Sequence, residues 1–286
     1  MNPVISVVIP LYNKVTIIKS SLESVLQQKT SVPFEIVIID DGSTDNSAKI
    51  VLEIASQYSN VRYVKQDNAG PSAARNKGIE LANGEWIVFL DADDLFLPNA
   101  LQNLYNTATQ ESDISFACAN FYTSLPNGKN HVHYPKIKSV ASKNPLRLMA
   151  FERIFPCQGT YIFNKRRIPG FRFNTQYRRY EDYDNLLAFF RTSPKIGVSS
   201  EYVMCYRLDY SAASKRCDST RDFVCHMDFS KKSFYEKILL GQLLRISAKD
   251  YAELKEQYKE EIIWCFLSYI IYLFNRLSAK VYRLFL

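Results

Sequence analysis

Short apolar runs alternate with amphipathic stretches over the first 120 residues. Five runs predict strands: Ile5–Ile9, Phe34–Ile39, Val61–Val64, Trp86–Leu90 and Ile114–Ala119. Apolar residues at helical spacing lie between them: Thr16–Gln27, a stretch capped by Ser43–Asp45 that runs to about Ser56, Pro71–Ala82 and Pro98–Thr109. Strands that alternate with helices form βαβ units, so the pattern predicts an α/β fold with a mostly parallel, Rossmann-like sheet and helices on both faces.

The regular alternation weakens after residue 120. Residues 120–227 mix loops and short strands with one helix at about Asp182–Arg191, and residues 228–260 are helical and strongly charged. We therefore expect three parts, residues 1–119, 120–227 and 228–286, of which the last is a helical extension.

The extension contains a long apolar segment. Ile262–Phe274 is interrupted only by Ser268, and its thirteen residues are too few to span a bilayer. Beyond it the basic residues Arg276, Lys280 and Arg283 share one helical face, and Leu277, Val281 and Leu284 line another. This pattern fits a terminal helix packed on the body or a helix lying on an anionic membrane.

Composition excludes disordered and fibrous classes, because 47% of the residues are hydrophobic and 23% are charged. Residues 1–119 hold 14 of the 29 acidic and 8 of the 36 basic residues, a net charge of −6; the rest of the chain therefore carries +13. A basic half favours an anionic partner such as a phospholipid surface or a phosphorylated substrate. No nucleic-acid-binding motif is present, so nucleic acid is not expected as a partner.

The cysteines and the first residues indicate the compartment. The six cysteines contain no C-x-x-C pair and no regular spacing, which is typical of reduced thiols. The start, MNPVISVVIP, has no basic region before its apolar run, so we expect no signal peptide and a cytoplasmic location.

Acidic residues follow two of the predicted strands. Asp40 and Asp41 end the second strand, and Asp91–Asp94 ends the fourth. Ligands of open α/β sheets bind at the carboxyl ends of strands, so these carboxylates are expected along one edge. Two carboxylates separated by one residue suit Mg²⁺ or Mn²⁺ bridged to phosphate oxygens. The alternative is an acidic cap on the helix that follows.

A segment rich in small residues, Asn68–Asn76, lies between the two acidic clusters. Its Gly and Ala residues permit close approach of the backbone to a ligand. Arg75, on the first turns of the predicted helix, either faces a phosphate or braces the aspartates, and a purely structural ion pair remains an alternative.

The segments SVVIPLYNK, DDGSTD and NAGPSAARNKGIELANGEWIVFLDADD resemble the family 2 glycosyltransferases of GT-A fold. The match covers residues 4–100, about a third of the chain. The resemblance implies a nucleotide-sugar donor, a divalent metal (Mn²⁺ or Mg²⁺) and inversion at the anomeric carbon. It also implies that residues 1–119 bind the donor and that residues 120–227 form the acceptor side of the same catalytic domain, with residues 228–286 as an acceptor-side or membrane-facing extension.

The resemblance also assigns roles to single residues. Pro10, Tyr12 and Asp41, with Asp40 beside it, would surround the nucleoside base. In Asp91–Ala92–Asp93, Asp91 would meet the ribose or sugar and share the metal with Asp93. In the segment Tyr180–Asp184, Asp182 would be the general base, with Glu181 as the alternative. The segment Tyr206–Ser214 resembles a loop that closes over the donor diphosphate, which implicates Arg207, Ser211 and Ser214.

These residues lead to a specific expectation about function. We expect transfer of a hexose from a UDP-sugar to a glycan or an undecaprenyl-diphosphate-linked sugar, with a β-glucosyl or β-galactosyl product. Related enzymes build O-antigen, capsule or exopolysaccharide, and the basic half and amphipathic tail favour a peripheral position on the inner face of the cell membrane. The alternatives are a polyprenyl-phosphate glycosyltransferase, disfavoured by the lack of a full membrane span, and a non-catalytic nucleotide-sugar-binding scaffold, disfavoured by the presence of Asp91, Asp93 and Asp182.

Overall fold

The computed structural model describes residues 2–125, 130–133, 140–192, 194–208, 219–247, 250–251 and 253–284. The strands are β1 (Ile5–Leu11), β2 (Phe34–Asp40), β3 (Val61–Lys65), β4 (Trp86–Phe89), β5 (Leu95–Phe96), β6 (Phe116–Ser124), β7 (Asn130–His133), β8 (Val140–Ser142), β9 (Tyr161–Asn164) and β10 (Ile196–Arg207). The α-helices are α1 (Ile18–Leu26), α2 (Ser47–Ala55), α3 (Pro71–Leu81), α4 (Ala100–Thr109), α5 (Pro145–Ala150), α6 (Glu181–Phe190), α7 (Phe234–Ser247), α8 (Leu254–Gln257) and α9 (Ile262–Leu284). Three 3₁₀ turns, Ser219–Arg221, Phe223–His226 and Lys259–Glu261, complete the set of described elements.

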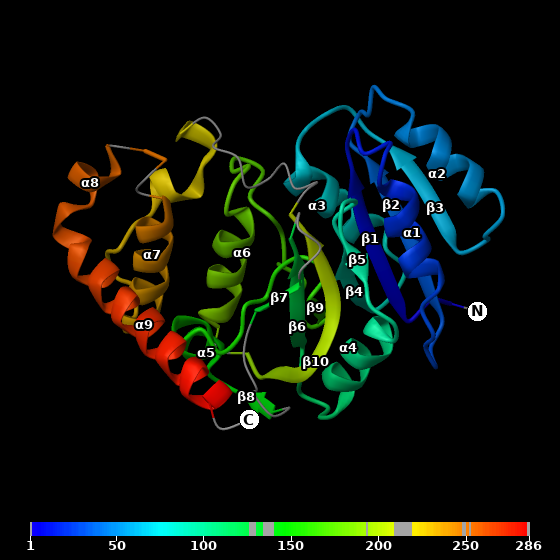
Figure 1. Ribbon diagram of the computed structural model, residues 1–286. Coiled ribbons are helices and arrows are strands. Elements are labelled where there is room, and N and C mark those ends of the chain that lie inside the picture. The colour runs from blue at the N-terminus through cyan, green and yellow to red at the C-terminus, as the bar shows by residue number, and fades with distance from the viewer. Residues whose placement is uncertain are drawn as a thin grey trace.

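One mixed sheet runs through the middle of the molecule in the order β3-β2-β1-β4-β9-β6-β10-β5, with β7 on β6 and β8 on β10 (Figure 1). Strands β1 to β4 pair in parallel, as the alternation of strands and helices predicts. The register pairs Leu11 with Asp40 and Val8 with Phe89. The ends of β1, β2 and β4 therefore lie along one edge of the sheet, and the two acidic clusters follow them there.

The second half of the sheet departs from a simple parallel continuation. The predicted fifth strand, found as β6, does not pair with β4, because β9 lies between them and is antiparallel to both. Among the described strands of this half, only β6 and β10 pair in parallel. The expected α/β fold class is correct, but its parallel character is concentrated in the first four strands. The boundary expected at residues 119 and 120 falls inside β6.

Helices cover both faces of the sheet, as predicted. Alternate residues of β1 point to opposite sides: Ile5, Val7 and Ile9 belong to the core shared with α1 and α4, whereas Val8 belongs to the core shared with α3 and α6. This period of two is the side-chain alternation of a strand buried on both faces.

The last part of the chain forms a separate layer of helices beyond α6, with α9 along the outer side of α7 (Figure 1). The segment expected to be helical at residues 228–260 contains α7, α8 and a 3₁₀ turn, and the apolar tail continues as one helix, α9, to Leu284. Among the residues that the structure describes, no helix combines the length and the apolar character needed to cross a bilayer.

Candidate active site

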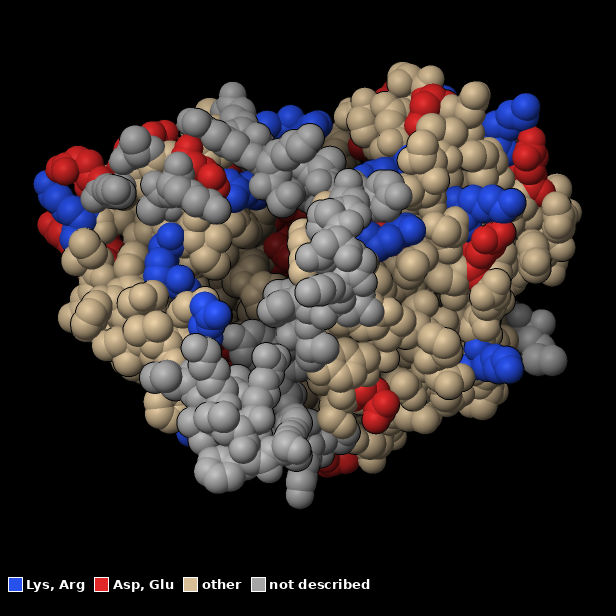
Figure 2. Space-filling model, viewed as in Figure 1, with Lys and Arg blue, Asp and Glu red and all other residues tan. Residues whose placement is uncertain are grey.

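A tight turn after β4 brings the Asp91–Ala92–Asp93 segment to the edge of the sheet. The Asp94 N–H donates to the Asp91 carbonyl at 3.0 Å, and the Ser21 hydroxyl donates to the Ala92 carbonyl at 2.8 Å. Ala92 is buried, whereas Asp91 and Asp93 are only partly so. Figure 2 shows acidic atoms within a hollow between the two halves of the molecule.

Arg75 joins this turn to the start of α6. Its Nη2 donates to Asp91 Oδ1 at 2.8 Å, and its Nη1 donates to Glu181 Oε1 at 2.8 Å. The side chain is buried, and burial alone would lower the pKa of the guanidinium; the charges of Asp91 and Glu181 outweigh this and raise it. A single guanidinium therefore holds together two acidic motifs that lie about ninety positions apart in the chain.

Asp182 follows Glu181 in the first turn of α6 and has a different environment. Glu181 is engaged by Arg75, whereas Asp182 accepts a hydrogen bond from the Tyr183 N–H at 2.9 Å. Burial, then the neighbouring charge of Glu181, raise the pKa of Asp182 to about 7, against the lowering effect of Arg75. A carboxylate with this pKa is suited to accept a proton near neutral pH.

Asp182 shares its surroundings with the turn after β4. Burial, and then the charges of Asp94, Asp182 and Asp91, raise the pKa of the Cys157 thiol well above its ordinary value. A thiol that remains protonated is a poor nucleophile, so Cys157 is not a candidate for covalent catalysis. All three carboxylates act on this one thiol, so the base candidate lies near the Asp91–Asp94 turn.

Asp93 forms an ion pair that the sequence motifs did not indicate. Lys14 Nζ lies 2.6 Å from Asp93 Oδ2, and both side chains are largely buried. Burial, then the charge of Asp91, raise the pKa of Asp93, and Lys14 opposes this effect. The ammonium thus occupies a position at Asp93 that a metal cation would also favour.

The described residues contain no group of three or more His, Cys, Asp or Glu side chains placed to hold a metal by themselves. Mg²⁺ bound to a nucleotide usually takes one or two carboxylates, with phosphate oxygens and waters completing its shell. Asp93, with Asp91 nearby, fits this second kind of site, in which the donor diphosphate supplies most ligands. Lys14 would have to give up its bond to Asp93 Oδ2 there.

Asp40 and Asp41 have distinct positions. Asp40 is fully buried, and its two oxygens accept from the Ser43 N–H at 2.8 Å and the Tyr63 hydroxyl at 2.5 Å. This geometry favours a structural part for Asp40 rather than the expected contact with the donor. Asp41 accepts from the N–H groups of Ala69 and Gly70, each at 2.8 Å, and so shapes the loop before α3.

The remaining donor residues divide in the same way. Tyr12 is 47% exposed and Pro10 is half-buried, both at the carboxyl end of β1, so both remain open to a ligand. The guanidinium of Arg207 instead donates to the hydroxyls of Ser20 and Ser21 and to the Asp93 carbonyl. The backbone N–H of Arg207 donates to the Asp94 carboxylate at 3.0 Å. Arg207 therefore braces the Asp91–Asp94 turn from behind. Ser211 and Ser214 lie outside the described residues.

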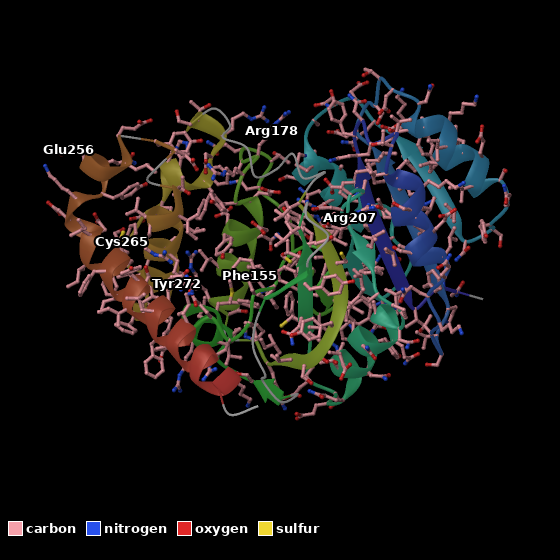
Figure 3. The ribbon with its side chains drawn as sticks, viewed as in Figure 1. Phe155, Arg178, Arg207, Glu256, Cys265 and Tyr272 are labelled. Carbon is pink, nitrogen blue, oxygen red and sulfur yellow. The ribbon has the colours of Figure 1, made fainter. Side chains whose placement is uncertain are left out.

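Arg178 lies against Gly70, a contact that the motifs did not indicate. A Cβ added to Gly70 would lie 3.4 Å from its Nε, which is buried and has no hydrogen-bond partner among the described residues. Figure 3 shows Arg178 near the top of the view and Arg207 on the side of β10. Only the fold could identify Arg178, because it contacts the loop before α3 at Gly70, more than a hundred residues away in the chain.

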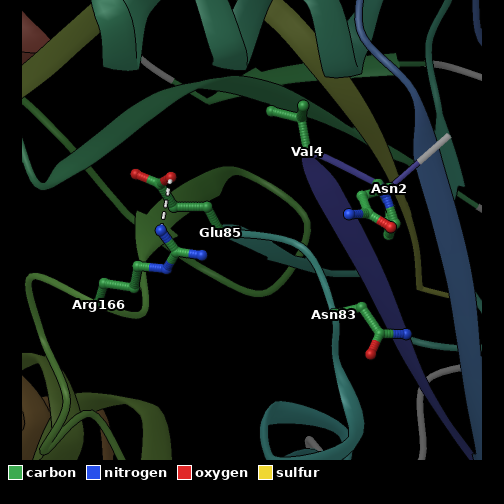
Figure 4. A pocket seen from close by; sticks show the side chains of 6 residues that line it. Asn2, Val4, Asn83, Glu85 and Arg166 are labelled. Atoms are coloured by element: carbon green, nitrogen blue, oxygen red, sulfur yellow. Dashed lines mark ion pairs between the residues drawn. The ribbon is translucent and has the colours of Figure 1, made fainter.

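A separate hollow lies elsewhere in the molecule. It has a volume of about 610 Å³ and is lined by Asn2, Pro3, Val4, Asn83, Glu85 and Arg166 (Figure 4). It lies at the amino ends of β1 and β4, and its ion pair joins Arg166 to Glu85 at 3.7 Å. Because parallel sheets bind ligands at the opposite edge, this hollow is not the candidate site.

Comparison with known proteins identifies the family of this chain. The family described as "Glycosyl transferase family 2" matches residues 6–198, a range that runs from the second residue of β1 through α6 into β10. The chain belongs to glycosyl transferase family 2. Glycosyltransferase GlyG of Streptococcus pneumoniae is 31% identical over 221 residues, covering 72% of this chain and 71% of GlyG.

Other known proteins match either a part of this chain in sequence or its fold alone. YibD of Escherichia coli K12, an uncharacterized glycosyltransferase, is 45% identical over 116 residues, which cover 41% of this chain and only 33% of YibD. The crystal structure of Staphylococcus aureus TarS residues 1–349 in complex with UDP-GlcNAc matches with a TM-score of 0.64 at 18% identity, covering 86% of this chain and 72% of that one. The likeness to TarS establishes a shared fold.

Proposed function

We propose that this member of glycosyl transferase family 2 is an inverting, metal-dependent transferase that moves a hexose from a UDP-sugar to a glycan or a lipid-diphosphate-linked sugar. The observation that carries the proposal is the bridge from Asp91 through Arg75 to Glu181. It brings a donor-side carboxylate motif and a candidate base into one cleft. The binding of UDP-GlcNAc by TarS, a protein of the same fold, supports a UDP-sugar as the donor.

In the proposed reaction the acceptor hydroxyl attacks the anomeric carbon as the bond from that carbon to the diphosphate oxygen breaks. Asp182 takes the hydroxyl proton, and UDP leaves with the bonding electron pair. Such a base typically contributes about 10²–10⁴-fold to the rate. Asp93, with Asp91, would hold Mn²⁺ or Mg²⁺, and the bound ion would neutralise charge on the departing diphosphate.

We further propose β-glucosyl or β-galactosyl transfer in the synthesis of a surface polysaccharide such as O-antigen or capsule, at the inner face of the cell membrane. The charge of +13 after residue 119 supports an anionic acceptor, and a lipid-linked diphosphate would supply that charge. Tyr12 and Pro10 are proposed to contact the nucleoside. Ser211 and Ser214 remain proposed donor residues.

The experiment is to measure UDP release from a panel of UDP-sugars, with Mn²⁺ or with EDTA, using a GlcNAc-diphosphate-lipid analogue as acceptor. We expect release from one donor that needs both the metal and the acceptor. UDP binding without release from any donor would favour a non-catalytic scaffold. If UDP itself fails to bind in the presence of Mn²⁺, the nucleotide assignment is wrong.

A further inference from the structure

The outer face of α9 is a row of large apolar side chains exposed to solvent. We call Ile262, Ile263, Phe266, Ile270, Leu273 and Phe274 the α9 outer face. At 100° per residue, these positions fall within about 120° of the helix circumference. Phe266 and Phe274 are 63% and 71% exposed, and Ile262 is 69% exposed. A contiguous exposed apolar stripe of this size is typical of a binding surface rather than of scattered surface residues.

The inner side of α9 packs against the rest of the protein. A Cβ added to Gly241 of α7 would lie 2.5 Å from the backbone carbonyl carbon of Trp264, so the two helices approach backbone to backbone. Ser268 is fully buried, and Asn275 donates to the Phe151 carbonyl at 3.2 Å. The helix therefore has two apolar sides, one packed on α7 and one left over. Figure 3 shows Cys265 and Tyr272 on this helix at the outer edge of the molecule.

The charge of α9 favours an anionic surface as the occupant of the free side. The chain from Ile262 to its last residue contains no Asp or Glu, and it contains the basic residues Arg276, Lys280 and Arg283. The carboxylates Glu256 and Glu260 precede the helix, so the positive charge is concentrated toward its C-terminal part. A helix that combines an apolar row with basic residues lies in the interface of an anionic bilayer.

We propose that the α9 outer face docks on an anionic phospholipid bilayer. The apolar side chains of Ile262–Phe274 enter the boundary between headgroups and acyl chains, and the exposed Arg276 meets lipid phosphate. This inference deepens the proposed location at the membrane, and it holds whichever donor and acceptor the cleft uses. A second copy of the chain could also cover an apolar helix face, and the experiment below separates the two occupants.

The test is flotation of the full chain with phosphatidylcholine vesicles that contain or lack phosphatidylglycerol, without any sugar donor. We expect binding to the anionic vesicles and a loss of about tenfold or more in the double variant Phe266→Glu/Ile270→Glu. The matched control is Leu52→Glu on α2, because Leu52 is also an exposed large apolar residue, at 51%, and lies outside α9. This control is expected to bind the vesicles as the unchanged protein does.

Two results would overturn the inference. One is equal flotation of the double variant and the unchanged protein. The other is a stable dimer of the unchanged protein in light scattering, dissociated by Phe266→Glu/Ile270→Glu, with no vesicle binding; the occupant would then be a second copy. Circular dichroism of each variant checks folding. Because no donor is present, failure of flotation leaves the proposed transferase activity untouched.

Discussion

Asp182 lies beside a second carboxylate in a partly buried position, and this decides the pH at which it can accept a proton. Burial and the charge of Glu181 raise its pKa to about 7. Below that value Asp182 is protonated and cannot act as a base. We expect kcat/KM to fall about tenfold for each pH unit below 7, measured as UDP release with saturating metal. A fall in kcat/KM that begins only near pH 4 would contradict the assignment of Asp182 as the base.

The same raised pKa means that ionised Asp182 lowers the stability of the folded protein. The folded protein binds the Asp182 proton more tightly than the unfolded chain does, so stability is lost as pH rises from the unfolded pKa through the folded one. Because an asparagine cannot accept the acceptor hydroxyl proton, Asp182→Asn is expected to abolish transfer and retain UDP binding. It is also expected to raise the free energy of unfolding by roughly 1–3 kcal/mol at pH 8 but not at pH 4. Unfolding in urea at the two pH values checks this.

Lys14 competes with a metal for Asp93. Its ammonium lies 2.6 Å from the carboxylate, so a divalent cation must displace it and bear its repulsion. We expect Lys14→Gln to increase Mn²⁺ affinity by about tenfold in the absence of nucleotide, measured by electron paramagnetic resonance. Lys19→Gln, which removes an exposed lysine paired with Glu23 at 3.9 Å, is the control. Unchanged Mn²⁺ affinity in the Lys14 variant would exclude this competition.

Sequence alone identified the acidic residues of the cleft but not their individual environments. Asp40 and Asp41 are both buried, and only the fold shows that Asp40 accepts from Ser43 and Tyr63 whereas Asp41 accepts from the loop before α3. Lys14 lies in the segment SVVIPLYNK and Arg178 lies in no quoted segment, but the contacts of both depend on residues brought together across the fold. Arg207 was expected at the donor diphosphate, yet its guanidinium donates to Ser20 and Ser21.

At the scale of elements, the sequence predicts the strands and helices that alternate in the first half of the chain, but not the strand pairing of the second half. The first four strands and the helices between them follow a repeated pattern of buried positions, which local spacing reveals. Strand β9 has only four residues, all of them buried, and its insertion beside β4 depends on long-range pairing. Strand β4 is equally short and equally buried, but it belongs to the repeated strand–helix pattern, whereas β9 does not.

The contact of α7 with α9 depends on one small residue. Any side chain at Gly241 would press on the Trp264 backbone at 2.5 Å and force the helices apart. We expect Gly241→Val to lower the free energy of unfolding by about 1–3 kcal/mol, measured by denaturant titration. Gly170→Ala is the control because nothing lies within 4 Å of its added Cβ, and a change within about 0.5 kcal/mol is expected there. Equal effects of the two variants would show that the contact is loose.

At the scale of the whole molecule, Arg75 connects the turn after β4 with the start of α6. Its removal leaves Asp91 and Glu181 partly buried without their shared cation. We expect Arg75→Met to cost about 3–5 kcal/mol in the free energy of unfolding and to weaken UDP binding, measured by denaturant titration and calorimetry. Lys77→Met on the exposed side of α3 is the matched control, with little expected change. A stable Arg75→Met protein with full UDP affinity would contradict the bridge.

The Arg75 bridge also sets a rule for recombining members of this family. Exchanging the acceptor side to obtain a new product would bring in another segment around position 181, while Arg75 stays with the donor side. A hybrid whose new segment lacks a carboxylate at that position would carry an unmatched cation in its interior. Productive hybrids are therefore expected from parents that keep this arginine and its distant glutamate together, whatever their overall similarity.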